Sequence, residues 1–382
     1  LLQSSFSTVL RSDSGWFSLQ LLVVTPVGFV AFGEDAPGEL YFLDYQEMSE
    51  TGEGGGGIYR LVPNPEKDES DSFPRTLSAT GLFSSVEKHL PASGVVPYSV
   101  ATELWADYAY AERFIAVPGD QPIDGEAGYP EGTVLARTVY LDQVRGEPST
   151  RRRIETQIFL RDRRNWRPYT YVWNAEQTDA TLAESVGADL TFSIKDPNSL
   201  DGSIKHAYRV PSRAECSICH TDKLGTLLGV SPAQLNHQYN YGAGAENQIA
   251  AWKRLGIYSN PIPEKELAKR MVHPFDSSAS LDDRARSYLH ANCGHCHRPG
   301  GGGTAMINFD YRLEREATRL VDIKPAQGAF GLKGSRIVAP GDPFASVLFY
   351  RMTKLGRGHM PPIGSARPAR RAPRHRPASR RR

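Results

Sequence analysis

The spacing of apolar residues divides this chain into a part that predicts strands and a part that predicts helices. Across 73–207, apolar and polar residues alternate in short runs, which is the period of half-buried β-strands. In one run, for example, Ile154 and Ile158 alternate with Glu155. Five strands are predicted there, at 111–117, 133–141, 153–160, 168–173 and 189–194. We therefore predict a mainly β, sandwich-like domain over 73–207.

Beyond position 208 the apolar residues recur every three or four positions, which is the spacing of amphipathic helices. The clearest case is 280–297, where Ser280 and Asp283 have the types and spacing of a capping box, so a helix should begin there. The face predicted to be buried holds Leu281, Ala285, Tyr288, Leu289 and Asn292. The residues predicted to face water are Asp282, Arg286 and His290.

Two further helices are predicted in the same part of the chain. One covers 246–255 and ends at Gly256, and the other begins at Asp342 and ends at Gly356, where glycine is a common helix terminator. We therefore predict a mainly α region, with one part over 208–275 and a second over 276–365.

The first 62 residues predict short strands separated by glycine-rich and proline-containing turns. Such a small set of strands needs neighbours to bury its apolar residues. The apolar run 16–32 is interrupted by polar residues and by Pro26, whereas a membrane helix needs about 20 mainly apolar residues. Buried strands are therefore favoured over a membrane span. The polar, proline-containing segment 63–72 is typical of an interdomain linker.

The strongest chemical signal is a Cys-x-x-Cys-His sequence that occurs twice, as CSICH at 216–220 and CGHCH at 293–297. This spacing is that of covalent c-type haem attachment, in which two thiols bond the haem and the histidine ligates its iron. The chain has four cysteines, and the two sequences use all of them. The predicted haem-binding residues are Cys216, Cys219, His220, Cys293, Cys296 and His297.

Zinc is the alternative for these cysteine pairs. The pairs of a zinc ribbon usually lie within about 15–20 residues of each other. Here Cys219 and Cys293 are much farther apart, and zinc does not explain a histidine after each pair.

A haem iron held by one histidine has a sixth position, and a methionine there raises the reduction potential, whereas an open position would allow peroxide to bind. For the second iron we predict Met360, in a proline-stiffened loop after a helix, with His359 as a competing ligand. For the first iron we predict Met271, while His237 and His273 remain possible.

The length, composition and charge of the chain limit the number of domains and the kinds of partner. With 382 residues and 40% hydrophobic content, the chain is long enough for two or three domains. Its net charge of +2 is misleading, because residues 367–382 hold eight arginines and no acidic residue. Without these eight arginines the formal net charge of the remaining chain is 2 − 8 = −6, so the folded part is mildly acidic. We therefore expect the folded part not to bind nucleic acid. The tail, 366–382, is predicted to be disordered and is either an altered end of the reading frame or a basic arm for anionic partners.

Several stretches resemble a family of di-haem c-type cytochromes found alone or fused behind quinoprotein sugar dehydrogenase β-propellers. The resemblance covers about 73–364 and is carried by stretches such as CSICH, NQIAAW, RARSYLHANCGHCHRPGG, APGDP and MPPIG. Residues 1–62, with FGEDAPGELYFLDY and GGIYRLVP, resemble the last blade of such a propeller. The family's domains end in a helix that crosses the first one, and this chain has no such segment. The predicted buried face of 281–292 therefore lacks its expected partner.

The resemblance implies a multidomain protein: a propeller-blade fragment, a linker, a mainly β domain and a mainly α cytochrome c region. It implies two covalently bound haem c groups and electron transfer between redox donor and acceptor proteins, the donor being a fused sugar dehydrogenase. Any pyrroloquinoline quinone (PQQ) and any dehydrogenase active site would lie outside this chain. No signal peptide is readable, but covalent haem attachment predicts the periplasm. The alternatives are a di-haem peroxidase and a zinc-stabilised binding module.

Overall fold

The computed structural model describes most of the chain between residues 7 and 365. The described ranges are 7–12, 15–20, 29–44, 57–60, 73–119, 121–124, 128–162, 165–220, 227–242, 244–259, 262–299, 301–362 and 364–365. The predicted linker 63–72 and tail 366–382 lie outside them. The chain divides into two compact units, Leu1–Phe73 with Gly300–Gly302, and Pro74–Pro299 with Gly303–Arg382.

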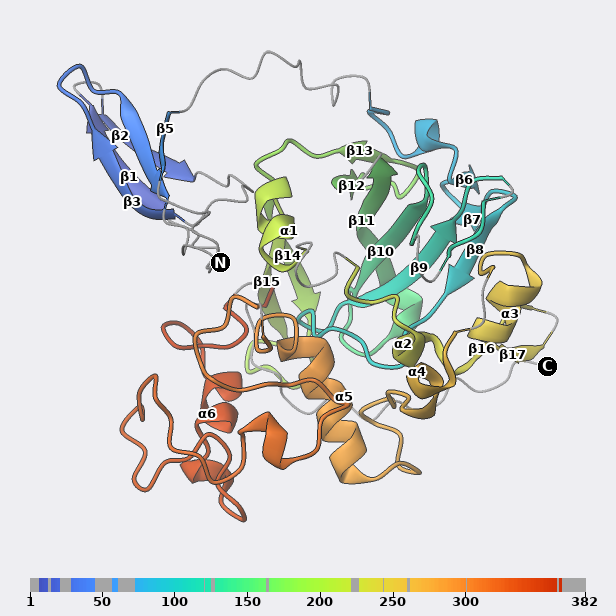
Figure 1. The fold of residues 1–382 in the computed structure, drawn as a ribbon. Coiled ribbons are helices and arrows are strands. Elements are labelled where there is room, and N and C mark those ends of the chain that lie inside the picture. The colour runs from blue at the N-terminus through green and yellow to red at the C-terminus, as the bar shows by residue number, and fades with distance from the viewer. Residues whose placement is uncertain are drawn as a thin grey trace, which may run out of the picture. The chain divides into compact units, whose positions relative to one another are not determined.

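The described part of the first unit consists of short antiparallel strands (Figure 1). Strand β1 (Ser7–Ser12) pairs with β2 (Gly15–Gln20), and β3 (Phe29–Glu34), β4 (Leu40–Asp44) and β5 (Gly57–Arg60) form a three-stranded sheet. The turn between β3 and β4 is held by Asp35, whose carboxylate accepts hydrogen bonds from Glu39 N–H at 2.8 Å and Tyr41 O–H at 3.1 Å. Strands were predicted here.

The second unit is built on a six-stranded antiparallel sheet in the order β13-β12-β11-β10-β9-β8. Its strands are β8 (Val95–Tyr98), β9 (Tyr110–Ala116), β10 (Val134–Asp142), β11 (Arg151–Asp162), β12 (Asn165–Trp173) and β13 (Ala180–Leu182). Each strand pairs with the next one in the chain, so the sheet is a meander. Four of the predicted strands correspond to β9, β10, β11 and β12.

Three two-stranded pairs accompany this sheet. They are β6 (Phe83–Ser85) with β7 (Leu90–Pro91), β14 (Ala188–Lys195) with β15 (Ser203–Val210), and β16 (Gln238–Asn240) with β17 (Ala245–Asn247). The fifth predicted strand is β14. Its Ile194 packs with Leu141 and Ile154 of the large sheet.

Six helices follow or interrupt these strands among the described residues. They are α1 (Arg213–Cys219), α2 (Pro232–Leu235), α3 (Gln248–Arg254), α4 (Glu264–Ala268), α5 (Leu281–Cys293) and α6 (Val347–Thr353). The longest, α5, has 13 residues. Strand residues outnumber helical residues, and the described chain after 208 is mostly turns and loops between short helices.

The predicted fold class is therefore wrong: there is no mainly α cytochrome c region among the described residues. The physical reason is the density of helix-ending residues. Gly256 takes a left-handed φ of +73° directly after α3, and Gly328, Gly331, Gly334 and Gly341 all have positive φ in the long segment before α6. Helical spacing of apolar residues predicted α3, α5 and α6, but not that turns and loops would make up most of the chain between the helices.

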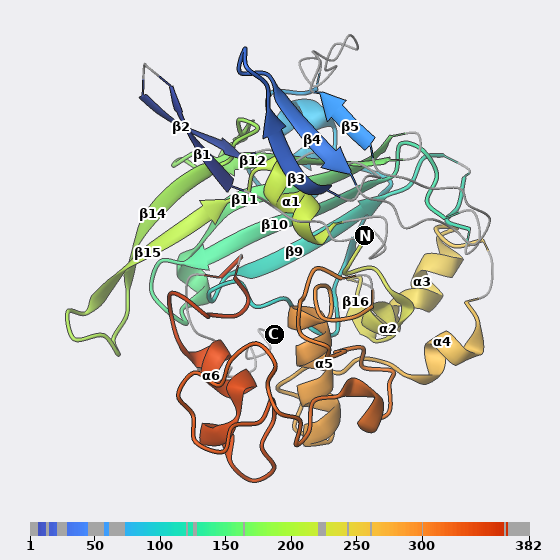
Figure 2. The same ribbon diagram turned by 60° about the vertical axis from the view of Figure 1, so that its left-hand side comes forward.

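The main apolar cluster joins the sheet to the short helices. Ile115 of β9 and Leu135 of β10 pack in it with Leu235 of α2 and Trp252 of α3. Leu235 and Trp252 have no exposed surface. Figure 2 shows α2 and α3 beside β9. The sheet is thus the surface on which the residues after 227 are assembled.

Helix α5 begins as predicted but buries different residues. Ser280 is its N-cap, with Ser280 Oγ accepting from Asp283 N–H at 3.1 Å and donating to the Asp283 carboxylate at 2.6 Å. Leu281 and Ala285, predicted to be buried, are exposed, Leu281 by 76%. Asn292 is buried as predicted, at 3% exposed, and Ser287 is buried although it was not in the predicted face. Asn292 Oδ1 accepts from Trp105 N–H at 2.6 Å, and Ser287 Oγ accepts from Val272 N–H at 3.0 Å. These loop segments cover the helix in place of the expected terminal helix.

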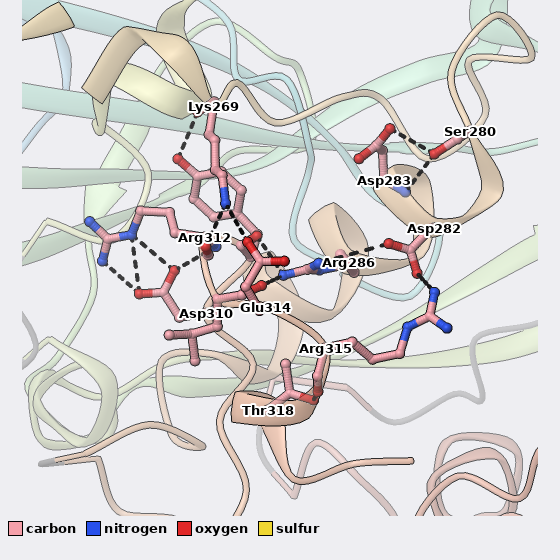
Figure 3. A network of polar contacts seen from close by, with 12 residues as sticks. Lys269, Ser280, Asp282, Asp283, Arg286, Asp310, Arg312, Glu314, Arg315 and Thr318 are labelled. Carbon is pink, nitrogen blue, oxygen red and sulfur yellow. Dashed lines mark hydrogen bonds and ion pairs between the residues drawn. The ribbon is translucent and has the colours of Figure 1, made fainter. Parts of the chain in front are cut away.

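The side of α5 that was predicted to face water contacts the segment 309–315 instead. Arg286 donates to the backbone carbonyls of Tyr311 and Leu313, and His290 Nδ1 lies 3.3 Å from Phe309 O. Figure 3 shows Arg286 reaching this segment. It also shows Asp282 between two arginines, with its carboxylate oxygens 3.8 Å from Arg286 Nη1 and 3.4 Å from Arg315 Nη2. The same network of polar contacts also includes Lys269, Asp310, Arg312, Glu314 and Thr318. The segment 309–315 is therefore fixed against α5.

Candidate functional site

The first CxxCH sequence lies on α1. Ser212 caps this helix, accepting from Glu215 N–H at 3.0 Å, while the Glu215 carboxylate accepts from Ser212 N–H at 2.7 Å. The helix places Cys216 and Cys219 about one turn apart and ends at His220, whose N–H donates to Cys216 O at 3.0 Å. The His220 ring lies 4.5 Å from the ring of Phe159 on β11. Both thiols and the imidazole thus belong to one helical turn.

The second CxxCH sequence begins at the last residue of α5. Gly294 follows, and a Cβ there would lie 2.6 Å from His290 O, so only glycine fits this turn. The backbone then turns again, because Cys296 N–H and His297 N–H both donate to Cys293 O, at 3.1 and 2.9 Å. The three predicted haem-binding residues of this sequence are therefore held in one compact turn.

The imidazole of His297 is enclosed by the chain that follows it. Gly303 N–H donates to Cys296 O at 2.9 Å, and a Cβ on Gly303 would lie 2.5 Å from His297 Nδ1. Phe309 N–H donates to His297 O at 2.9 Å, and the two rings meet edge to face at 5.7 Å. Burial lowers the pKa of His297, which favours the neutral imidazole that ligates metals.

The structure brings the two CxxCH sequences together. Cys219 Sγ, Cys296 Sγ and a ring nitrogen of His295 all lie within 4.8 Å of one another. Hydrogen bonds from the Cys219 thiol, which has the larger effect, and from His295 lower the pKa of Cys296 to about 4. The same hydrogen bond between the two cysteines raises the pKa of Cys219. Nothing in the sequence indicated this meeting.

The other two thiols are buried away from that hydrogen bond. Desolvation raises the pKa of Cys216 and of Cys293 to about 12. Each motif therefore holds one thiol that takes part in the Cys219–His295–Cys296 cluster and one that is buried outside it.

Cys293 and Met360 line the same cavity. It is a small pocket that is partly open to solvent, and Trp105 and Tyr288 form part of its wall. Met360 is held there because its N–H donates to Arg351 O, in α6, at 3.0 Å. The predicted sixth ligand and the second CxxCH sequence thus meet, although Met360 lies 63 positions after His297 in the chain.

His359 lines this cavity too, and its hydrogen bonding suits a metal ligand. Its Nδ1 lies 2.7 Å from Lys354 O, and its Nε2 is buried without a hydrogen-bond partner. A proton on Nδ1 donated to that carbonyl leaves the lone pair on Nε2, which is how ligating histidines are usually oriented. The structure therefore keeps both candidates for the second iron.

The candidates for the first iron are engaged elsewhere. Met271 is 2% exposed and packs with Ala101 and Ala233. His237 Nε2 lies 2.9 Å from Ser99 Oγ and 3.2 Å from Gln248 Nε2. The described contacts of Met271 and His237 thus include no residue of either CxxCH sequence.

His273 is the remaining candidate. Its Nδ1 accepts from Phe275 N–H at 3.2 Å, within its own loop.

No protein-family model, curated protein or solved structure matches this chain. The assignment of the site therefore depends on its chemistry.

That chemistry fits haem c. Each CxxCH sequence offers two thiols and an imidazole in one turn, and beside the second are an aromatic-walled cavity and the buried, unpartnered Nε2 of His359. No helix of the described residues is long and apolar enough to cross a membrane.

Proposed function

We propose that this chain is a di-haem c-type cytochrome that carries single electrons. The observation that supports this most is the meeting of the two CxxCH sequences, in which Cys219 and Cys296 lie within 4.8 Å of each other. Each sequence supplies the two thiols and the following histidine that a covalent haem requires. The two sets of attachment bonds would then be close neighbours, which suits electron transfer from one group to the other.

The chain's own residues hold and tune the two groups. Cys216 and Cys219 anchor the first haem and His220 ligates its iron. Cys293 and Cys296 anchor the second haem in the same way, and His297 ligates its iron. Reversible one-electron chemistry is what the haems supply when bound. The packing of Gly303 and Phe309 against His297 fixes that imidazole and buries its Nδ1 atom.

Met360 is the proposed sixth ligand of the second iron. Its place in the cavity with Cys293 and the hydrogen bond that ties its backbone to Arg351 support this role. A thioether in this position raises the reduction potential and suits an electron carrier. His359 is the alternative, with its unpartnered Nε2 in the same cavity.

The electron donor that we propose is a quinoprotein sugar dehydrogenase module, and the acceptor is a further redox protein. This follows from the resemblance of 1–62 to a propeller blade and of 73–364 to cytochromes fused behind such propellers. The place of action would be the periplasm, where covalent haem attachment is completed. No PQQ site is proposed within this chain.

A haem count on the mature protein tests the proposal. The chain is expressed with the cytochrome c maturation machinery, denatured and assayed as its pyridine haemochrome, and we expect two covalent haems per chain. The double variants Cys216→Ser/Cys219→Ser and Cys293→Ser/Cys296→Ser should each retain one. A colourless protein, or haem that acidified solvent extracts, would exclude covalent attachment.

A di-haem peroxidase is the second candidate, because Met271, His237 and His273 all have other described contacts. An open sixth position on the first iron would let peroxide bind there. Peroxide turnover, together with a high-spin signal in the half-reduced protein, would favour this activity over simple electron transfer. A fully low-spin protein without turnover would favour the carrier.

A further inference from the structure

His295 is a residue that haem attachment does not use. It stands between the two cysteines of the second motif, yet one of its ring nitrogens lies within 4.8 Å of both Cys219 Sγ and Cys296 Sγ. The three residues come from two segments, the end of α1 and the turn after α5. Two sulfurs and an imidazole nitrogen that converge in this way form a ligand set for a thiophilic cation.

We propose that the haem-free chain binds one Zn²⁺ ion through Cys219, His295 and Cys296. Zinc–sulfur bonds of about 2.3 Å in a tetrahedral site place two sulfurs roughly 3.8 Å apart, and zinc–nitrogen bonds are about 2.0–2.1 Å. The observed spacing of at most 4.8 Å therefore needs only small side-chain movements. Two thiolates and one imidazole leave a fourth position for water, as in zinc sites with three protein ligands.

This site is distinct from two independent Cys-x-x-Cys zinc sites, because it takes one cysteine from each motif. Cys216 and Cys293 take no part in the cluster. The ion would link the end of α1 to the turn after α5 before any haem is present. It would also occupy one thiol of each motif, so zinc binding and covalent haem attachment exclude each other. The inference does not depend on the haem proposal, since it concerns the chain before maturation.

A metal titration of the full chain, produced without the maturation machinery and kept reduced, tests the proposal. Zinc is added in competition with a chromogenic chelator, and we expect one tight site per chain. Cobalt in its place should give the intense sulfur-to-cobalt absorption and tetrahedral d–d bands of a site with two thiolates. The variants Cys219→Ser and His295→Ala should each weaken zinc binding at least about tenfold.

Matched controls make the result specific. Cys216→Ser and Cys293→Ser are the same kind of change in the same two motifs, and both should keep the wild-type affinity. Equal losses in these controls would mean that each Cys-x-x-Cys pair chelates by itself, which overturns the proposal. Full affinity in Cys219→Ser, or no stoichiometric binding at all, overturns it as well.

Circular dichroism accompanies each titration. A chain that stays unfolded in the presence of zinc would also contradict the proposal, because the site exists only where α1 and α5 are assembled. The haem count is made separately on matured protein, so haem attachment can succeed while zinc binding fails, and the reverse. Matured protein with two haems should bind no zinc at this site.

Discussion

At the scale of single residues, the cavity beside Cys293 holds two candidate ligands for the proposed second haem iron. Met360 and His359 are consecutive, yet each is held by its own hydrogen bond to a different backbone carbonyl, Arg351 O or Lys354 O. The sequence predicted both residues as candidate ligands, because a Met-Pro pair after a predicted helix is recognisable in it. It could not show that His359 leaves Nε2 unpartnered, since that depends on the conformation of the loop.

Replacing Met360 by alanine should remove the sulfur ligand of the second iron. We expect the weak sulfur-to-iron charge-transfer band at the red end of the oxidised spectrum to disappear and the reduction potential of that haem to fall. His359→Ala is the matched control and should keep the band. Loss of low-spin character in His359→Ala, with Met360→Ala unchanged, would assign the iron to His359.

Gly303 determines how closely the chain can pack on His297. Gly303→Ala would place a methyl group 2.5 Å from Nδ1, so the imidazole or the loop must move. We expect a loss of about 1–3 kcal/mol in the free energy of unfolding and a changed spectrum of the second haem. Gly302→Ala is the control, because a Cβ there meets nothing within 4 Å. Equal effects of the two variants would contradict the role given to Gly303.

Glu155 on β11 gives the protein a pH dependence of its own. It is buried, and desolvation raises its pKa to about 7, although Tyr208 O–H donates to it at 2.8 Å. Because the folded state holds the proton more tightly than the unfolded state, stability should fall as the pH rises from about 5 to about 7. The shift corresponds to about 3 kcal/mol.

Glu155→Gln should remove this dependence and leave a protein that is more stable than the wild type at pH 8. Denaturant unfolding at pH 5 and pH 8 measures both effects. A wild-type stability that rises over this interval, with the variant following it, would show that another group dominates.

At the scale of elements, α5 shows where reasoning from sequence succeeds and where it stops. Ser280 and Asp283 predicted its start correctly, because a capping box is a local arrangement of neighbouring residues. The predicted burial failed for Leu281 and Arg286, since the face that is covered depends on segments far away in the chain. Arg286 is held by carbonyls of 311–313, which no helical period can reveal.

Asn292 connects α5 to the loop that carries Trp105. Asn292→Ala removes the acceptor of Trp105 N–H and the donor to Tyr288 O at 2.8 Å. An unsatisfied buried group costs about 1–3 kcal/mol, and we expect the free energy of unfolding to fall by that amount. Asp282→Ala, which removes partly exposed ion pairs on the same helix, should cost about 0–1 kcal/mol. Chemical denaturation compares the two, and equal costs would contradict the prediction.

At the scale of the whole molecule, the sequence could not predict that Cys219 and Cys296 lie close together. Each motif was recognisable by itself, as were most strands of the sheet. Their juxtaposition arises because the residues after 227 pack on the sheet through Leu235 and Trp252, and such contacts leave no periodic signal. The error in fold class has a related origin, since local spacing predicts single helices but not the long turns and loops that separate them, such as the segment with positive φ at Gly328, Gly331 and Gly334.

If both haems are attached, their irons should interact magnetically. We expect the electron paramagnetic resonance spectrum of the oxidised protein to be broadened relative to the sum of two isolated haems. The one-haem variants Cys216→Ser/Cys219→Ser and Cys293→Ser/Cys296→Ser supply those isolated spectra. A wild-type spectrum equal to their sum would mean that the two centres are independent.

The meander order of the large sheet has a consequence for how the protein is made. Every strand from β8 to β13 pairs with its neighbour along the chain, so these pairings close short loops. Short sequence separation between contacting residues favours rapid folding, whereas the bonds of Trp105 and Thr102 to Asn292 and Val272 span more than a hundred positions. The sheet should therefore form first during biosynthesis, and the cysteine-bearing segments should dock on it late, while their thiols are still within reach of the enzymes that modify them.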